Sequence, residues 1–310
     1  MSVSGLWQGW CGLWFREVDA RSLGVMRIGL GLILVLWHLS LWPDLELLVA
    51  PWGAVDVATL EAGWTDYRAS YLGLVSEPWQ LHLVHALGLA VLLAFTAGYQ
   101  TTVVKWLALA IMVSTWHRNP WIHNGGDRLL RIALFTLALS PCGAALSMDA
   151  VRRGARATVP ILTHRLIQLQ WLVMYTYTGI VKLPGPAWMD GSALYYALSD
   201  ANYSRFTGAM DTLLATGAGQ LVATTSSYVT LGWEVLFAPL VLWRRTRWWA
   251  LGFGVLVHVG IFTTMSVGIF SLISVWGYLA WVDPERLGAM FSGKGTPPPA
   301  TAVRQRSGLL

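Results

Sequence analysis

The sequence predicts an all-α protein, a polytopic transmembrane helical bundle with about eight spans. Of its 310 residues, 55% are hydrophobic and only 12% are charged, whereas a soluble domain carries roughly 25% charged residues to keep its surface wet. The 19 Trp and 10 Tyr residues belong to side-chain types that favour the membrane–water boundary. The net charge of +5 comes without a basic stripe interleaved with aromatic residues, so we expect no nucleic-acid partner.

Apolar stretches long enough to cross the hydrocarbon core recur along the chain. They lie at 23–42, 80–98, 102–117, 129–147, 163–183, 222–243, 248–263 and 266–282. The last two are so close that a single bent segment or a re-entrant pair is an alternative. Residues 1–22 then form a cytoplasmic N-terminal segment, 23–283 the transmembrane domain, and 284–310 a cytoplasmic tail whose Pro-rich composition predicts disorder. This alternation puts most of the 21 basic residues and both termini in the cytoplasm.

Two long connections, 43–79 and 184–221, lie on the outer side in this topology. The first could carry a short amphipathic helix on the membrane surface. The second begins LPGPAWMDG, in which the prolines end the preceding helix. Cys11 and Cys142 lie in neither a CxxC nor a metal-ligand spacing, so we predict neither a disulfide nor a metal site.

Lys182 lies at the outer end of the predicted fifth span, within YTYTGIVKLPGPAWMDG. An ionisable group at such a depth requires a partner, a cavity or a function. A helix-end lysine can simply extend its amine to the lipid headgroups. Alternatively, partial desolvation favours the neutral amine, which can act as a base. The prolines and glycines that follow would hold backbone close to this amine.

Two further places carry polar side chains on the same predicted side. His258, toward the outer end of the seventh span, is either a packing residue or a partner at about the depth of Lys182. In the third outer connection, HRNPWIHNGGDRLLR, the residues His123, Asn124 and Asp127 crowd together. Asp127 is alternatively the cap of the fourth helix. The convergence of these groups near the outer leaflet predicts a site but does not identify its chemistry.

Glu234 is a carboxylate well inside the predicted sixth span, in LGWEVLFAPL. A carboxylate in that position must be either protonated or paired with a cation. An Arg of a neighbouring span is one possible partner, and the sequence does not name it.

Three segments of this chain resemble a known family. HNGGDRLLR after the third span, GIVKLPGPAWMDG at the end of the fifth and VHVGIFTTMSVGIF across the last two are similar to the HTTM family. That family comprises the bacterial relatives of the vitamin K-dependent gamma-glutamyl carboxylase. The resemblance extends over residues 15–285, and GIVKLPGPAWMDG is its most specific part.

The resemblance implies a role for Lys182, which with Leu183 and Trp188 matches the family's basic lysine. In the carboxylase this lysine deprotonates a vitamin K-type hydroquinone, which reacts with O2 to become an epoxide, while CO2 adds to a substrate glutamate; no metal takes part. General-base efficiency improves when the base is matched to the working pH. His258 matches a family histidine that would orient or polarise groups near the lysine. The implied quinone pocket is lined by His123, Asn124, Asp127, Tyr177 and Trp188.

Two departures from the family limit what it implies. This chain reads His123-Asn124 where the eukaryotic enzyme has Asn-His, and little sequence follows the last span where that enzyme has a large luminal domain. We therefore expect quinol epoxidation, with or without carboxylation of a peptide, protein or small substrate. The alternatives are a non-catalytic quinone- or lipid-binding membrane protein, or an accessory to peptide-toxin maturation. A transporter is disfavoured because no internal repeat is visible. The expected location is the bacterial inner (plasma) membrane, with membrane lipid and quinone as partners.

Overall fold

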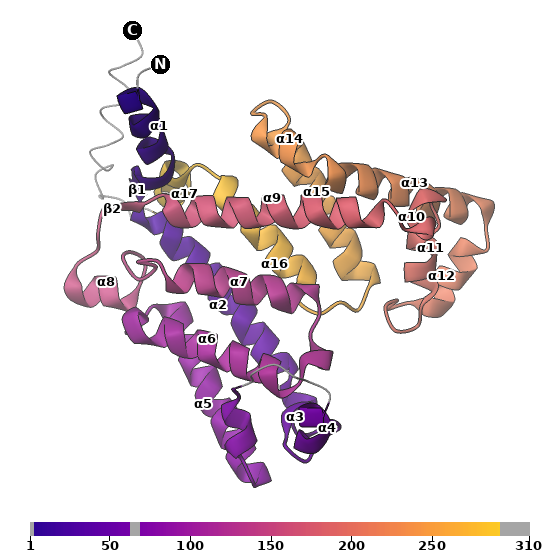
Figure 1. The fold of residues 1–310 in the computed structure, drawn as a ribbon, viewed down its shortest axis with the longest axis horizontal. Coiled ribbons are helices and arrows are strands. Elements are labelled where there is room, and N and C mark those ends of the chain that lie inside the picture. Colours follow the sequence, from indigo (N-terminus) through magenta and orange to yellow (C-terminus); the bar gives the residue numbers. More distant parts are fainter. Residues whose placement is uncertain (1–2, 63–68, 292–310) are drawn as a thin grey trace. The chain divides into compact units, whose positions relative to one another are not determined.

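The computed structural model describes residues 3–62 and 69–291, and this part of the chain is almost wholly helical (Figure 1). The predicted all-α class is therefore confirmed. The chain divides into two compact units: unit 1 is Met1–Leu166 with Leu279–Leu310, and unit 2 is Ile167–Tyr278. Between them, helix α9 (Leu162–Lys182) and the 3-10 helix η4 (Gly277–Trp281) carry the chain from one unit to the other.

The elements of unit 1 are α1 Val3–Phe15, β1 Glu17–Asp19, α2 Ala20–Ser40, η1 Trp42–Asp44, α3 Leu45–Val49, α4 Val57–Ala62, η2 Tyr71–Leu74, α5 Pro78–Ala97, α6 Thr101–Arg118, η3 Pro120–Ile122, α7 Gly125–Ala138, α8 Met148–Arg153, β2 Thr158–Pro160 and α17 Pro284–Met290. Those of unit 2 are α10 Pro186–Met189, α11 Ala193–Ser199, α12 Thr207–Leu214, α13 Gly217–Val235, α14 Phe237–Leu242, α15 Arg247–Thr264 and α16 Phe270–Trp276.

Four long helices build the core of unit 1. Helix α2 packs against α5 and α7, and α6 packs against both of these (Figure 1). Leu23, Leu30 and Leu34 of α2 are fully buried, as are Leu92 of α5 and Leu134 of α7. Within a membrane these side chains exchange lipid contacts for protein contacts, so close packing rather than removal from water accounts for the association of these helices.

A pair of buried histidines joins α2 to α5. The rings of His38 and His85 stack with centroids 3.7 Å apart. The Nε2 of each lies within hydrogen-bonding distance of the other's carbonyl oxygen, at 2.9 and 3.1 Å. The sequence analysis did not single out this pair, because each histidine by itself is an isolated polar residue in an apolar helix.

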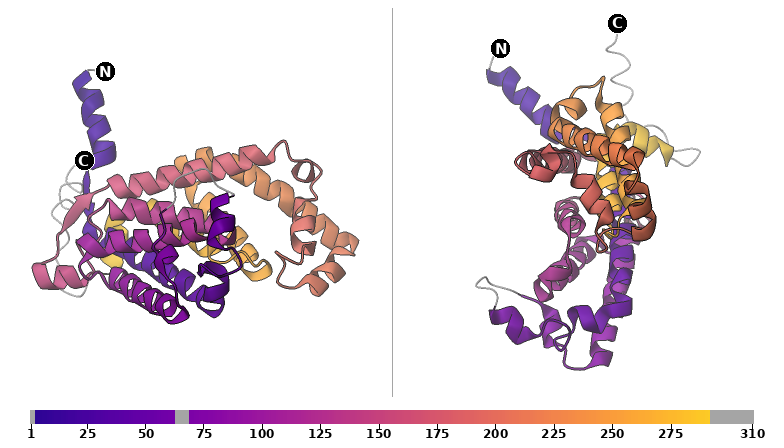
Figure 2. Two further views of the ribbon diagram at one scale, coloured as in Figure 1. Left: turned by 60° about the horizontal axis from the view of Figure 1, so that its bottom comes forward. Right: turned by 90° about the vertical axis from the view of Figure 1, so that its right-hand side faces the viewer.

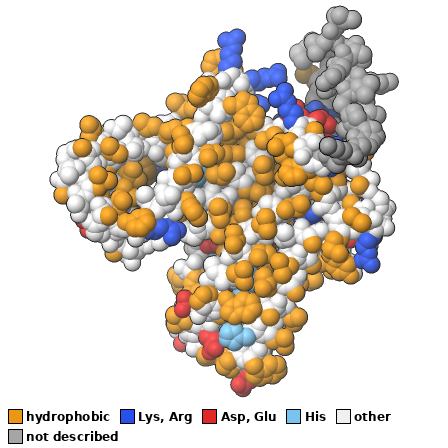
Figure 3. All heavy atoms as spheres, turned by 180° about the vertical axis from the view of Figure 1, so that it is seen from behind, with side chains coloured by type: hydrophobic (Ala, Val, Ile, Leu, Met, Phe, Trp, Pro, Cys, Tyr) orange, Lys and Arg blue, Asp and Glu red, His pale blue; other side chains and the backbone are white. Residues whose placement is uncertain are grey.

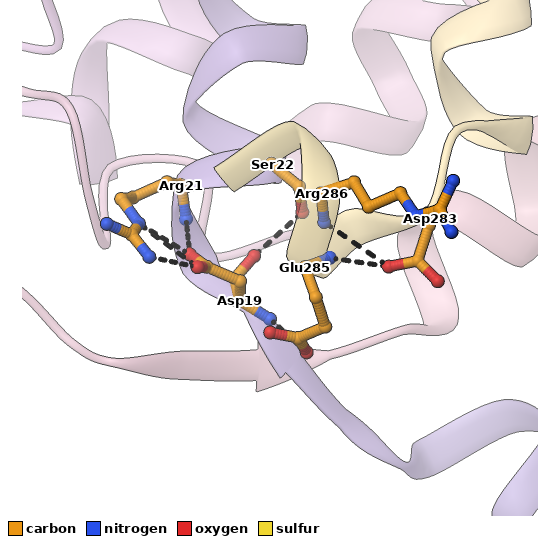
Figure 4. Close-up of polar contacts among 6 residues, drawn as sticks. All are labelled: Asp19, Arg21, Ser22, Asp283, Glu285 and Arg286. Atoms are coloured by element: carbon orange, nitrogen blue, oxygen red, sulfur yellow. Dashed lines mark hydrogen bonds and ion pairs between the residues drawn. The ribbon is translucent and has the colours of Figure 1, made fainter. Parts of the chain in front are cut away.

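Helices α2 and α17 of unit 1 pack together beside the short antiparallel pair β1–β2, and α17 also contacts β1. The carboxylate of Asp19 forms an ion pair with Arg21 and accepts the Arg21 amide at 2.8 Å. The Asp19 amide in turn donates to Glu285 of α17 at 3.2 Å, and Asp283 caps α17 by accepting the Glu285 amide (Figure 4). The segment predicted as a disordered tail thus begins with a packed helix, whereas residues 292–310 lie outside the described part.

In unit 2, helices α13 to α16 pack in succession along the chain. The short helices α10, α11 and α12 gather against α13 (Figure 2). The Leu194 amide donates to the Ser227 hydroxyl at 3.0 Å, and the Tyr228 hydroxyl donates to the Met189 carbonyl at 2.9 Å. The predicted outer connection 184–221 is therefore a compact helical layer on α13.

Two helical stretches in the described residues are long and apolar enough to cross a membrane, Ala20–Val49 and Pro78–Ala97. Only 28% of the second is buried, whereas a core helix of a soluble protein would be mostly covered. Leu83, Leu87 and Leu93 of α5 are each about half exposed, and hydrophobic side chains spread over the face drawn in Figure 3.

Most predicted spans coincide with a helix, but three differ in extent. The span predicted at 129–147 ends early, at Ala138 of α7, because Pro141 and Gly143 interrupt helical structure. The span at 222–243 is two helices that meet at Leu236. The last predicted span is α16 continued by the 3-10 helix η4.

Candidate functional site

Lys182, the principal candidate from the sequence, forms an ion pair with Glu234 in unit 2. Its Nζ lies 2.5 Å from Glu234 Oε2, with the two side chains 25% and 11% exposed. The structure therefore supplies the partner that the sequence left open for Glu234, and it is a lysine rather than an arginine. A charge-assisted contact of this length is stronger than a hydrogen bond between neutral groups.

The close approach of α9 to α13 makes this pair possible. Gly179 lies one turn before Lys182, and a Cβ built there would fall 2.6 Å from the Val235 amide nitrogen. Real Cβ atoms do not approach backbone so closely, so only glycine allows the two helices this spacing. The sequence GIVK thus combines a contact surface for α13 with the amine that follows it.

The turn that follows α9 places Trp188 against Lys182. Pro184 cannot continue the helix, and Pro186 takes the first position of α10. The Gly185 amide donates to the Lys182 carbonyl at 2.9 Å. The Lys182 ammonium lies over the Trp188 ring, 4.5 Å from its centroid, a cation–π geometry. Of the predicted pocket residues, Trp188 is the one that contacts Lys182.

His258 belongs to a second polar cluster in the same unit. The Tyr175 hydroxyl lies 2.6 Å from His258 Nε2 and 2.8 Å from the Tyr278 hydroxyl. All three side chains are buried, with exposures of 2% for Tyr175 and His258 and 7% for Tyr278. Gly254 makes room for this cluster, since a Cβ there would fall 2.3 Å from the Tyr278 hydroxyl.

The two clusters of unit 2 lie on one face of α9. Tyr175 and Lys182 are separated by two helical turns, a rise of about 10.5 Å along the axis. The His258 ring contacts Tyr175 and Phe270. Tyr177, by contrast, is 65% exposed and lies on another face of the helix. His258 is therefore linked to the helix that carries Lys182 through Tyr175.

His123, Asn124 and Asp127 lie in unit 1, at the start of α7. Asn124 accepts the Gly126 amide at 2.7 Å, and Asp127 accepts the Asn124 amide at 2.7 Å, which together form a capping box. The structural interpretation of Asp127 as part of a helix cap is thus confirmed. His123 Nδ1 lies 3.6 Å from Asp127, and the His123 ring lies 5.0 Å from that of Trp116.

Three residues of the candidate site were not named as such from the sequence. Glu234 was visible as a carboxylate in an apolar stretch, but its role depends on a lysine 52 residues away. Tyr175 and Tyr278 carried no signal, because tyrosines are frequent in this chain and a buried hydroxyl cannot be recognised without the packing. Lys182 and His258 were therefore predictable from the sequence, whereas the groups that hold them were not.

The fold and these two clusters are those of a helical protein with a partly buried lysine–glutamate pair. The chain belongs to the HTTM-domain family, whose model matches residues 15–285, and the HTTM domain is a membrane domain. The match confirms the resemblance drawn from the sequence, and membership is consistent with kinship to the carboxylase. Comparison with the curated proteins and with the solved structures finds no match.

Proposed function

We propose that this protein is a membrane enzyme of quinol chemistry in which Lys182 and Glu234 together accept a proton from a vitamin K-type hydroquinone. The reaction would be epoxidation of the quinol, with or without coupled carboxylation of a glutamate. The observation that carries the proposal is the 2.5 Å Lys182–Glu234 contact beside the Trp188 ring, in the motif that most closely resembles the carboxylase. Family membership supports the proposal.

The surroundings of Lys182 suit an apolar aromatic ligand. Ile180, Val181, Leu183 and Met189 are 42–57% exposed, so the amine lies amid an apolar surface that a lipid-soluble ring could reach. Trp188 offers an aromatic face at the amine itself, against which a flat ring can stack. Polar groups placed within an otherwise apolar surface are typical of cofactor sites.

The pair can take up a proton without leaving a charge uncompensated. With the proton on Glu234, the Lys182 amine has a free electron pair directed at a ligand hydroxyl. After transfer, Lys182 is an ammonium facing the anion of the ligand, and opposite charges at that distance attract. When bound, the hydroquinone would supply the four electrons that O2 takes up, two in becoming the quinone and two from the ring C=C bond that becomes the epoxide, so that one oxygen atom ends in the epoxide and the other in water. This oxidation would provide the base that removes a glutamyl proton, and CO2 would add to the resulting carbanion.

In this proposal His258 is a positioning residue. It holds the Tyr175 hydroxyl, which also contacts Tyr278, and so fixes the buried half of α9 two turns from Lys182. We further propose the eight-span topology, with both termini cytoplasmic, in a bacterial inner membrane. The support is the coincidence of helices with most apolar stretches and the exposed apolar surface of α5.

A second function is favoured by one feature of the same pair. An ammonium already matched by a carboxylate needs no catalytic role, because such a pair can serve to join α9 to α13. The protein would then bind a quinone or lipid, or assist the maturation of a peptide toxin, without turnover. The two functions differ in whether the amine must lose a proton.

The deciding experiment measures epoxide from reduced vitamin K and O2 with the purified full chain in nanodiscs. Lys182→Arg is the informative variant, because arginine can keep the ion pair with Glu234 but cannot be deprotonated in proteins. Lys182→Ala and Glu234→Gln are run beside it, and tryptophan fluorescence reports that each variant is folded.

We expect epoxide from the parent protein and a loss of at least about 100-fold in Lys182→Arg, the scale typical of removing a general base. Turnover retained by Lys182→Arg would refute the base role. If the folded parent forms no epoxide but retains the quinone, the non-catalytic function is the correct one.

A further inference from the structure

A pocket in unit 1, away from the Lys182 motif in sequence, is lined by several cationic side chains. It has a volume of about 510 Å³ and is lined by the start of α6, the segment after α7, and α8 with the residues that follow it. Three cationic side chains line it: Lys105, Arg153 and Arg156. Neither the quinol proposal nor the family match assigns a role to this pocket.

The cations of this pocket outnumber the one carboxylate that lines it, Asp149, which attracts Arg153. Lys105 donates to the Ser140 carbonyl at 2.9 Å, which holds its ammonium at the pocket wall. Across the described residues, no carboxylate lies within ion-pair distance of Lys105, Arg153 or Arg156. Both arginines are exposed, so their guanidinium groups are available to a ligand.

Asp149 is the one acidic residue that lines the pocket, and its oxygens are already engaged. They accept the Gln100 amide at 2.9 Å, the Thr101 amide at 2.8 Å and the Thr101 hydroxyl at 2.7 Å. These bonds cap the start of α6, where a negative charge is stabilised. The carboxylate therefore belongs to the structure of the wall, and the cations determine what the pocket attracts.

A further positive charge lies behind the wall. The guanidinium of Arg27 is fully buried and donates to the Cys142 carbonyl at 2.8 Å and the Leu146 carbonyl at 2.5 Å. These bonds fix the 142–146 segment that forms one side of the pocket. Since a buried charge is screened less than an exposed one, Arg27 adds to the positive potential inside.

Helix α8 separates this pocket from an apolar one. On the other side of α8 lies a second pocket of about 410 Å³, lined mostly by the apolar side chains of Ala97, Leu146, Met148 and Val151, with Ser147 and Arg152 also at its wall. Met148 is 48% exposed and Val151 is 87% exposed. A ligand with a charged head and an apolar chain could thus use the two sides of one short helix.

We propose that the pocket of Lys105, Arg153 and Arg156 binds a phosphate group. Guanidinium groups bind phosphate oxygens in a bidentate manner, and lysine adds a point charge. Basic pockets beside membrane helices on the cytoplasmic side bind phospholipid headgroups, and the predicted topology puts these residues there. The adjoining apolar pocket favours a phospholipid over free phosphate as the source of the group.

The test uses the purified full chain in neutral detergent, with native mass spectrometry to count bound lipid. The probes are dioctanoyl phosphatidylglycerol, dioctanoyl phosphatidylcholine and inorganic phosphate as a competitor. The variant is Arg153→Gln/Arg156→Gln, which leaves the Lys105–Ser140 bond in place. The matched control is Arg244→Gln/Arg245→Gln, which removes the same charge from two exposed residues of unit 2.

We expect phosphatidylglycerol to bind the parent and the control equally and the pocket variant about tenfold more weakly. Inorganic phosphate that displaces the lipid would show that the phosphate alone is recognised, whereas phosphate without effect would assign the site to the whole lipid. Equal loss of binding in the control and the pocket variant would overturn the proposal. Equal binding by the parent, the pocket variant and the control would also overturn it. Thermal unfolding of each variant, which we expect to match the parent, separates lost binding from lost folding.

Discussion

The ion pair between Lys182 and Glu234 should stabilise unit 2 as well as serve chemistry, and its contribution can be bounded from its burial. Removing one partner of a fully buried pair costs about 3–5 kcal/mol, whereas an exposed pair contributes about 0–1 kcal/mol. With the side chains 25% and 11% exposed, we expect Glu234→Gln to destabilise the protein by about 2 kcal/mol. Lys182→Met should cost a similar amount, because it leaves the carboxylate without its cation.

The measurement is a double-mutant cycle of these two substitutions. Urea unfolding in detergent micelles, followed by tryptophan fluorescence, gives the free energy of each variant. The double variant should be less unstable than the sum of the singles, with a coupling of about 1–2 kcal/mol that largely survives at 1 M salt. Additive costs, with a coupling below about 0.3 kcal/mol, would show that the contact is not an energetic pair and refute the reasoning.

Three further predictions concern stability. Gly179→Ala should force α9 from α13 and cost about 1–3 kcal/mol, measured by thermal unfolding; a shift within error would contradict the close approach. Asn124→Ala should lose the α7 cap and cost about 1 kcal/mol, seen as faster hydrogen exchange in the first turn, whereas unchanged exchange would disprove the cap. Burial, with the nearby Asp19 and Asp283 carboxylates, raises the pKa of Glu285, so the folded state binds its proton more tightly and stability falls as pH rises above about 4.5. Glu285→Gln should flatten the stability profile there, and an unchanged profile would count against it.

The helices could be predicted from the sequence because each depends on its own residues. Long apolar stretches make α2, α5, α6, α9 and α15 recognisable, and their ends fall within a few residues of the predicted limits. The span predicted at 129–147 was too long because the stretch is apolar on average, although it contains Pro141 and Gly143. The mean hydropathy of a stretch depends on its overall composition, whereas the end of a helix is set by single residues such as proline and glycine.

The site was only half predictable for a related reason. The contact of Lys182 with Trp188 depends on six residues of chain and one proline turn, so a motif can encode it. The contact with Glu234 depends on which face of α13 meets α9, and the sequence of α13, with Ser and Thr scattered among its apolar residues, does not reveal that face. Gly179 was the one local sign of it, since a glycine within a helix often marks a close packing partner.

The meeting of β1 with α17 has a consequence for biosynthesis. Asp19 and Glu285 are 266 positions apart, and unit 1 is interrupted by the whole of unit 2. Because a chain emerges from the ribosome from its N-terminus, unit 1 remains incomplete through the synthesis of more than a hundred inserted residues. The surface around Asp19 therefore stays without its α17 contacts until nearly the last described residue has been synthesised. A nascent chain stalled before α17 would therefore present an unfinished first unit to chaperones and proteases, although most of that unit had been synthesised long before.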